Sequence, residues 1–308
     1  MNGKTDRIVA LMSIAAMGMG SLCSEVRATV ALSPAADGHI TVPAFVNGKG
    51  PFPFILDTGA DNTGIYLGFS VKQHLTVGKA RDVDGQTGSV SSPTLLLNSL
   101  SVDGHTIHHI VADGLPDRRD AGLEAGAAGN DLMDGTIAVF DFPCSTVQLR
   151  PKPVDITKLV SSDSVVVRGG TVPDGTLLTM PVTLAGVESL AYLDTGSRDT
   201  RLSPGFAAAA HVDTASPVFH DGDAIFGVGL KGKPSRIGPV GPLRFAGMTI
   251  AQAQARVIDL PLFGTFGPDN QRPAMILGMD ILQAYRLVYD HEAKRFWFTS
   301  SGCKRTSP

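Results

Sequence analysis

Two halves of this chain repeat each other, and in each half an apolar run ends in Asp-Thr-Gly. Residues 40–59 read ITVPAFVNGKGPFPFILDTG, and residues 178–196 read LTMPVTLAGVESLAYLDTG. Two further landmarks follow in the same order: LSVDGHTIHHIV (100–111) beside LRFAGMTIAQAQ (243–254), and AAGNDLMDGTIAVFDFPCSTVQL (127–149) beside ILGMDILQAYRLVYDHEAKRFWF (276–298). A repeat of this length indicates a repeated structural unit, so the sequence predicts two similar lobes in one chain.

The residues within each half favour short strands and tight turns. The chain of 308 residues contains 35 glycines and 20 prolines among alternating Val, Thr and Leu residues, a pattern typical of strands. The segments 139–142 and 147–149 are expected to form a terminal hairpin, as are 287–289 and 296–298, and short helical turns are expected only at 131–134 and 280–284. The sequence therefore predicts an all-β fold of two closed or sandwich-like lobes related by a pseudo-twofold axis. A site formed by both lobes would lie on that axis.

The N-terminal 28 residues differ from the rest. Lys4 and Arg7 precede an apolar run at 8–22, and small and polar residues follow. This layout is typical of a secretory signal peptide, and the run is short for a membrane span. We expect cleavage near residue 28, export to the periplasm or the medium, and no stable membrane association afterwards. An uncleaved N-terminal helix or anchor is the alternative. The remainder would divide into an N-terminal lobe at 29–155 and a C-terminal lobe at 156–308.

The composition narrows the function classes. The chain is 43% hydrophobic with a formal net charge of −3, and it lacks the basic or acidic blocks that nucleic-acid or polybasic membrane binding would require.

No Cys/His spacing resembles a zinc site, and His105 and His109 would lie about 13 Å apart along a strand. We therefore expect neither a metal nor another cofactor. In an oxidising compartment Cys144 and Cys303 would form a disulfide or remain two buried thiols.

Asp57 and Asp194 are the candidate catalytic residues. Each ends a buried-looking strand, and burying a carboxylate is costly unless it is paired, hydrogen-bonded or used. A duplicated turn is the structural alternative, because Asp and Gly are common turn residues. Two adjacent carboxyls share one proton, so one serves as a base for a water and the other as an acid for the substrate. Such a pair activates a water without a covalent intermediate or a cofactor.

The doubled motif resembles the pepsin–retropepsin superfamily of aspartic peptidases over about residues 38–300. Residues 57–61 (DTGAD), with Thr63, are similar to the retroviral form, and residues 194–197 (DTGS), with Thr200, are closer to the pepsin form. Residues 276–278 (ILG), and more weakly 127–129 (AAG), resemble the apolar-apolar-Gly element beneath the active-site loop. The resemblance implies a bacterial-type single-chain aspartic endopeptidase with two retropepsin-like lobes, active as a monomer on a polypeptide substrate.

The resemblance also implies roles for the motif residues. Asp57 and Asp194 would be catalytic, and the active-site loops would be supported by Thr58, Gly59, Thr195, Gly196 and Ser197. The two threonines would exchange hydrogen bonds across the axis. We expect the Ser197 hydroxyl to bond the Asp194 carboxylate, whereas Ala60 offers Asp57 no such group. This difference would make the pair asymmetric and favour activity at mildly acidic to neutral pH.

Two glycine-containing hairpins, at 81–91 and 224–233, are candidate flaps over an extended substrate. The substrate-binding candidates are Asp61, Gly85, Gly88, Phe226, Gly227 and Gly229. Neither stretch contains the tyrosine of a pepsin-type flap, which favours a design with two flaps; ordinary surface hairpins are the alternative. Arg198 is the counterpart of Asp61, so one end of the cleft would be more cationic. A non-proteolytic binder or inhibitor on the same fold is the rival function, and an enzyme limited to one partner protein is a narrower one.

Overall fold

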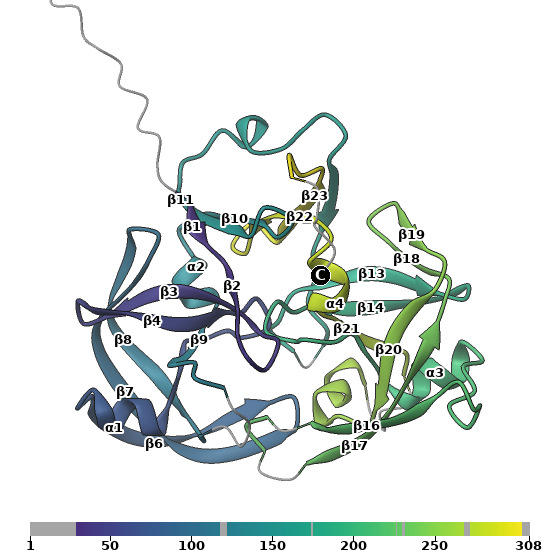
Figure 1. The fold of residues 1–308 in the computed structure, drawn as a ribbon, viewed down its shortest axis with the longest axis horizontal. Coiled ribbons are helices and arrows are strands. Elements are labelled where there is room, and N and C mark those ends of the chain that lie inside the picture. The colour runs from purple at the N-terminus through teal and green to yellow at the C-terminus, as the bar shows by residue number, and fades with distance from the viewer. Residues whose placement is uncertain are drawn as a thin grey trace, which may run out of the picture.

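The computed structural model describes residues 29–117, 122–173, 175–225, 227–229, 232–267 and 272–303. The expected signal peptide at 1–28 and the flap residue Phe226 lie outside the described residues. Within the described ranges, no helix is long and apolar enough to cross a membrane. Most of the described chain forms strands, arranged as two lobes beneath a shared sheet (Figure 1). The expected all-β fold is therefore confirmed.

The N-terminal lobe is built on an eight-stranded sheet. In spatial order its strands are β2 (Ser33–Pro34), β3 (Ile40–Val46), β4 (Lys49–Leu56), β9 (Gly126–Ala128), β5 (Gly64–Tyr66), β8 (His105–Leu115), β7 (Gly88–Val102) and β6 (Thr76–Gly85). Strand β3 also pairs with β7, so the sheet curls back on itself. The short helix α1 (Leu67–Lys72) follows β5.

The C-terminal lobe repeats this plan with a nine-stranded sheet. Its spatial order is β16 (His220–Ile225), β17 (Lys233–Val240), β20 (Ala253–Ile258), β15 (Arg201–Leu202), β21 (Ala274–Leu277), β14 (Val187–Leu193), β13 (Thr179–Leu184), β18 (Leu243–Phe245) and β19 (Met248–Ile250). The helix α3 (Pro204–Ala209) begins at Ser203, whose hydroxyl accepts a hydrogen bond from the Phe206 N–H at 3.1 Å. The turn η2 (Pro261–Phe266) precedes β21.

A third, six-stranded sheet joins the lobes. Its spatial order is β1 (Val30–Ala31), β11 (Thr146–Pro151), β10 (Thr136–Asp141), β22 (Arg286–Asp290), β23 (Arg295–Thr299) and β12 (Val165–Arg168). The hairpins β10–β11 and β22–β23 end the two repeats, and β10 pairs antiparallel with β22 where they meet. The expected terminal hairpins are present, and their pairing makes one sheet of them. The 3-10 turn η1 (Ile156–Lys158) lies in the connection between the lobes.

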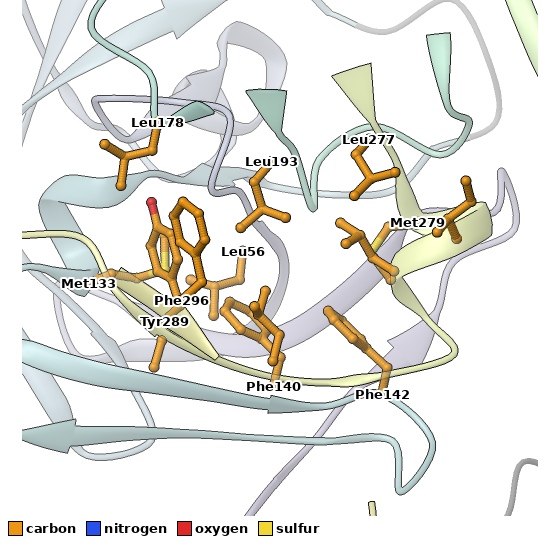
Figure 2. Packing of buried hydrophobic residues seen from close by; sticks show 14 of the residues in the cluster. Leu56, Met133, Phe140, Phe142, Leu178, Leu193, Leu277, Met279, Tyr289 and Phe296 are labelled. Carbon is orange, nitrogen blue, oxygen red and sulfur yellow. The ribbon is translucent and has the colours of Figure 1, made fainter. Parts of the chain in front are cut away.

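The inner face of the joining sheet packs against the residues that directly precede the Asp-Thr-Gly loops. Figure 2 shows Phe140 and Tyr289 of this sheet gathered with Leu56 and Leu193, which directly precede the two aspartates. The rings of Tyr289 and Phe296 stack with centroids 5.9 Å apart. These side chains are buried in one hydrophobic cluster that runs through both lobes. Packing at near-crystalline density resists small shifts, so this cluster fixes the two loops relative to each other.

Short helices and one disulfide complete the fold. The expected helical turns are present as α2 (Asn130–Met133) and α4 (Met279–Leu282), each directly after an apolar-apolar-Gly element. The helices α1 and α3 were not expected, because short helices after a strand leave little periodic signal in the sequence. Cys144 and Cys303 form a disulfide with Cα atoms 5.2 Å apart. This bond ties the β10–β11 turn to the segment after β23 and resolves the choice that the sequence left open.

Candidate active site

The two aspartates follow equivalent strands of the two lobes. Asp57 comes directly after β4, which runs parallel to β9, and Asp194 comes directly after β14, which runs parallel to β21. The Asp57 N–H donates to the Ala128 carbonyl at 2.9 Å, and the Asp194 N–H donates to the Leu277 carbonyl at 3.2 Å. The apolar runs before each aspartate are buried on both faces, so each strand delivers its aspartate from the lobe interior to the surface between the lobes.

The loops that carry the aspartates are joined by four hydrogen bonds. The Thr58 N–H donates to Thr195 Oγ1 at 3.0 Å, and the Thr195 N–H donates to Thr58 Oγ1 at 3.1 Å. Each hydroxyl then donates across the axis, Thr58 to the Leu193 carbonyl at 2.7 Å and Thr195 to the Leu56 carbonyl at 2.6 Å. All of these groups are buried. This is the exchange that the resemblance implies, and it holds Asp57 and Asp194 side by side.

Gly59 and Gly196 make the close approach of the carboxyls possible. A Cβ on Gly59 would lie 2.5 Å from Asp194 Cγ, and a Cβ on Gly196 would lie 2.4 Å from Asp57 Cγ. Any larger residue would displace the opposite carboxyl. The Gly59 N–H donates to Asp57 Oδ1 at 2.8 Å, and the Gly196 N–H donates to Asp194 Oδ1 at 2.9 Å. Each carboxyl is therefore oriented by its own loop and packed against the glycine of the other.

The carboxyls of Asp57 and Asp194 lie close enough for each to shift the pKa of the other. Burial raises the pKa of Asp57 well above its ordinary value, and the neighbouring charge of Asp194 raises it further. Burial also raises the pKa of Asp194, but the nearby Arg201 guanidinium opposes this increase. Two adjacent carboxyls share one proton, and the charge of Arg201 favours the ionised form on Asp194.

The raised pKa values predict how stability changes with pH. The unfolded chain loses these protons near pH 3.9, before the folded chain does, so the stabilisation from the pair is complete below about pH 4 and declines as pH rises through the folded-state pKa values. Relative to the unmutated chain, Asp57→Asn should therefore gain stability between about pH 4 and pH 7, by at most about 1.4 kcal/mol per pH unit. Urea denaturation of both proteins across this range measures the difference. A difference that is independent of pH would contradict the assignment.

A hairpin of the N-terminal lobe covers Asp194. Gln86 lies at the tip between β6 and β7, and its side-chain amide donates to Asp194 Oδ2 at 2.7 Å. The amide oxygen of Gln86 accepts a hydrogen bond from Nη1 of Arg201. Arg201 begins β15, seven residues after Asp194, and its side chain is 7% exposed. Neither residue was among the sequence candidates. The duplication carries a signal for Arg201, because glycine occupies the equivalent place after Asp57.

The two expected flaps meet above the pair, as the approach of β6–β7 to β16–β17 shows in Figure 1. Thr87 is buried; its hydroxyl accepts from the Gly229 N–H at 3.0 Å and donates to the Gly229 carbonyl at 3.3 Å. A Cβ on Gly85 would lie 2.8 Å from the Val228 side chain, and one on Gly227 would lie 2.8 Å from Thr87. Gly88 has a φ of 128° and faces open space. The described residues of the two tips therefore contact each other across the lobes.

Three other sequence candidates lie at the edge of the pair. The Ser197 hydroxyl donates to the Asp199 carbonyl at 2.9 Å, which corrects the expected bond to the Asp194 carboxylate. The asymmetry of the pair comes from Gln86 and Arg201 instead. Asp61 accepts a hydrogen bond from the Thr176 hydroxyl. Arg198 donates to the Asp37 carbonyl at 2.6 Å, next to the first loop.

Asp131 and Asp280 support the loops from behind. Asp131 accepts from the Thr63 hydroxyl at 2.8 Å, and Asp280 accepts from the Thr200 hydroxyl at 2.7 Å. Both carboxylates also accept the N–H of the next residue, in α2 and α4 respectively. They are thus structural groups within the first turns of α2 and α4, whose N-cap residues are Gly129 and Gly278. Asn130, which sequence reasoning missed, donates to the Thr58 carbonyl at 3.2 Å and accepts from the Tyr289 hydroxyl at 2.9 Å.

A possible cation-binding cluster lies apart from the paired aspartates. Within the described ranges, Asp37, His39 and Glu124 bring three potential ligand atoms within 4.8 Å of one another. His39 Nδ1 and Asp37 Oδ2 already form a hydrogen bond at 2.5 Å. The peptide-cleaving chemistry of a carboxyl pair needs no such ion.

Comparison with known proteins bears on the first half of the chain. Residues 42–131 match the family model described as aspartyl protease. The match extends from β3 into α2 and includes Asp57 with its Thr-Gly loop, whereas Asp194 lies outside it. A search of curated proteins finds no match to this chain. The second loop is therefore related to the first by the internal duplication and by the shared geometry described above.

Proposed function

Because this chain belongs to the aspartic protease superfamily, we propose that it is an endopeptidase that uses a water activated between Asp57 and Asp194. The observation that carries the proposal is the pair of adjacent carboxyls with raised pKa values, each packed against the glycine of the other loop and held by reciprocal threonine bonds between two duplicated lobes. A pair of carboxyls that shares one proton supplies both the base and the acid that hydrolysis of an amide requires.

The steps follow from where the shared proton resides. Asp194, charged and close to Arg201, takes a proton from the water as the water oxygen bonds to the carbonyl carbon of the substrate. Asp57 gives its proton to the carbonyl oxygen, which yields a neutral tetrahedral diol. Proton transfer to the amide nitrogen then allows the C–N bond to break, and the products are a carboxylic acid and an amine. No bond forms between enzyme and substrate in this sequence, so an acyl intermediate has no part in it.

Binding requires the Gln86 side chain to leave Asp194. A polypeptide over the pair occupies the space that the Gln86 amide fills, so the β6–β7 hairpin must lift or shift before cleavage. The hairpin tip is held by Thr87 and Gly229 across the lobes, and these few contacts are weak enough to exchange for contacts with substrate. We further propose that the mature protein acts as an exported monomer, because one chain carries both aspartates and its disulfide suits an oxidising compartment.

The test is cleavage of a reduced and alkylated protein by the purified chain, from about pH 3 to pH 8. Mass spectrometry of the products should show new internal termini. The cleavage should be blocked by a statine-type inhibitor that mimics the tetrahedral diol, and added hydroxylamine should yield no hydroxamate. A hydroxamate product would contradict the direct attack by water.

A non-proteolytic binder is the second candidate, and the cover formed by Gln86 favours it to a degree. An amide hydrogen-bonded to Asp194 keeps water and substrate away as long as the hairpin is closed. If no protein or peptide is cleaved at any pH while the unmutated chain binds the statine-type inhibitor, the candidate to pursue is a binder or an enzyme restricted to one partner protein. Absence of both cleavage and inhibitor binding would reject the endopeptidase.

A further inference from the structure

The Arg201 side chain lies beside Asp194, the aspartate that the proposed function places at the cleaved bond. One amide group, that of Gln86, links it to the Asp194 carboxylate: the amide nitrogen donates to Asp194 and the amide oxygen accepts from Arg201. When a substrate displaces this amide, the substrate residue beside the cleaved bond therefore comes within reach of the Arg201 guanidinium. The Nε of Arg201 is buried and donates to none of the described residues. The guanidinium thus has donors to offer once Gln86 departs.

The fold itself does not require an arginine at this position. Strand β15 pairs in parallel with β20, where Arg201 lies opposite Arg256. In the N-terminal lobe the equivalent strands β5 and β8 place Gly64 opposite Asp113. The same local backbone therefore forms around a glycine in one lobe and an arginine in the other. The arginine is a feature of this side of the cleft and points to a role in recognition.

Arg201 and Arg256 share one direct ion-pair partner, and Asp194 contributes a second negative charge near Arg201. In the described part of the chain, the ion pairs of Arg201 and Arg256 go to one carboxylate, that of Asp199. Arg201 Nη2 lies 3.7 Å from Asp199 Oδ1, whereas the Nε of Arg256 contacts Asp199 Oδ2 directly. The other contacts of Arg256 are to neutral groups, the Asp223 carbonyl and the Ser235 hydroxyl. Burial lowers the pKa of Arg201, the charges of Asp199 and Asp194 raise it, and those of Arg256 and Arg198 lower it. A buried guanidinium that loses the Gln86 amide needs another acceptor in its place.

We propose that Arg201 forms a subsite for an acidic substrate residue, whose carboxylate replaces the Gln86 amide on the guanidinium. The charged acceptor gives a stronger hydrogen bond than the amide it replaces. The substrate class is therefore a polypeptide with Glu or Asp beside the cleaved bond. This inference rests on the proposed endopeptidase function, which it deepens.

The experiment compares peptides that differ only in carrying Glu, Gln or Lys at each position flanking the cleaved bond. At about pH 5.5 a substrate glutamate is ionised. We expect kcat/KM to be at least tenfold higher for Glu than for Gln at one of these positions, and lowest for Lys. The ratio should fall to about one in Arg201→Met, and the preference should turn towards Lys in Arg201→Glu. Arg236→Met, which removes an arginine paired with the exposed Asp221, should keep the ratio of the unmutated chain.

The readout separates this inference from the function on which it depends. Cleavage of all peptides with equal kcat/KM for Glu and Gln would overturn the acidic subsite and leave the endopeptidase in place. If no peptide is cleaved, calorimetric binding of the Glu and Gln peptides to the unmutated chain decides the matter: tenfold tighter binding of Glu supports the subsite, and equal or undetectable binding overturns it. Because the Glu-to-Gln ratio of the unmutated chain is itself decisive, the test does not depend on the folding of a variant.

Discussion

Asp57→Asn and Asp194→Asn should each lower kcat/KM for peptide cleavage by at least about a thousandfold. Either change removes one of the two proton-transfer groups, and a single positioned acid or base contributes about 10²- to 10⁴-fold. The loss should appear in kcat, because an amide of the same size leaves the cleft shape unchanged. Since Asp57 and Asp194 act as a unit, the double variant should be about as impaired as either single variant.

Measurement of kcat and KM for the three variants and the unmutated chain with one peptide tests this. Asp221→Asn is a matched control, because its side chain is exposed and far from any role in the pair; it should keep full activity. Circular dichroism and thermal denaturation should show that all variants fold. Retention of a tenth or more of the activity by either single variant would exclude the shared-proton mechanism.

Thr58→Val should lower the free energy of unfolding by about 3 kcal/mol. The change removes a hydroxyl that donates to the Leu193 carbonyl and accepts from the Thr195 N–H. Both partners are buried, and each unsatisfied buried group costs about 1–3 kcal/mol. Valine has nearly the same shape, so the loss reports on the hydrogen bonds and not on a cavity. Because the two loops would no longer be fixed to each other, kcat should also fall by about tenfold or more.

Thr94→Val provides the matched control for this substitution. The Thr94 hydroxyl donates to one carbonyl, that of Lys79, at 2.9 Å, and it lies away from the two aspartates. We expect it to cost about 1 kcal/mol and to leave kcat unchanged. Urea denaturation followed by circular dichroism gives the stabilities. Equal costs for Thr58→Val and Thr94→Val, with equal kcat values, would mean that the reciprocal bonds do not hold the aspartates in place.

The catalytic candidates could be predicted from the sequence because the chain contains two copies of one unit, so that equivalent positions in the two copies can be compared. Asp57 and Asp194 stand at the same place in both copies, after runs too apolar to end in an unused carboxylate. The Thr-Gly residues that follow were identified in the same way. By contrast, the glycine in place of Arg201 in the first copy marks a difference but not a role, and Gln86 lies in the expected flap at 81–91 without a feature that singles it out. The importance of both residues depends on a hairpin of one lobe reaching across to the other. Such a contact leaves no local pattern in either segment.

Ser197 illustrates why a motif does not fix a hydrogen bond. The sequence places its hydroxyl near Asp194, but a hydroxyl rotates to the best acceptor in reach, which is the Asp199 carbonyl of its own loop. Choosing between two acceptors requires the loop geometry, which residue types alone do not specify. The structure therefore reassigns the asymmetry of the pair from Ser197 to Arg201, through the charge that the latter places beside Asp194.

The sequence by itself determined two all-β lobes, the strands that deliver the aspartates and the hairpins that end each repeat. It could do so because the side-chain period of a strand and the residues of a turn are local properties. Only the tertiary structure decided that β10 pairs with β22 to join the lobes, that Cys144 meets Cys303, and that Gln86 covers Asp194 beside Arg201. Alternation shows which face of a strand is buried but not which distant strand will lie beside it. That choice is made by packing and by charge across segments far apart in the chain.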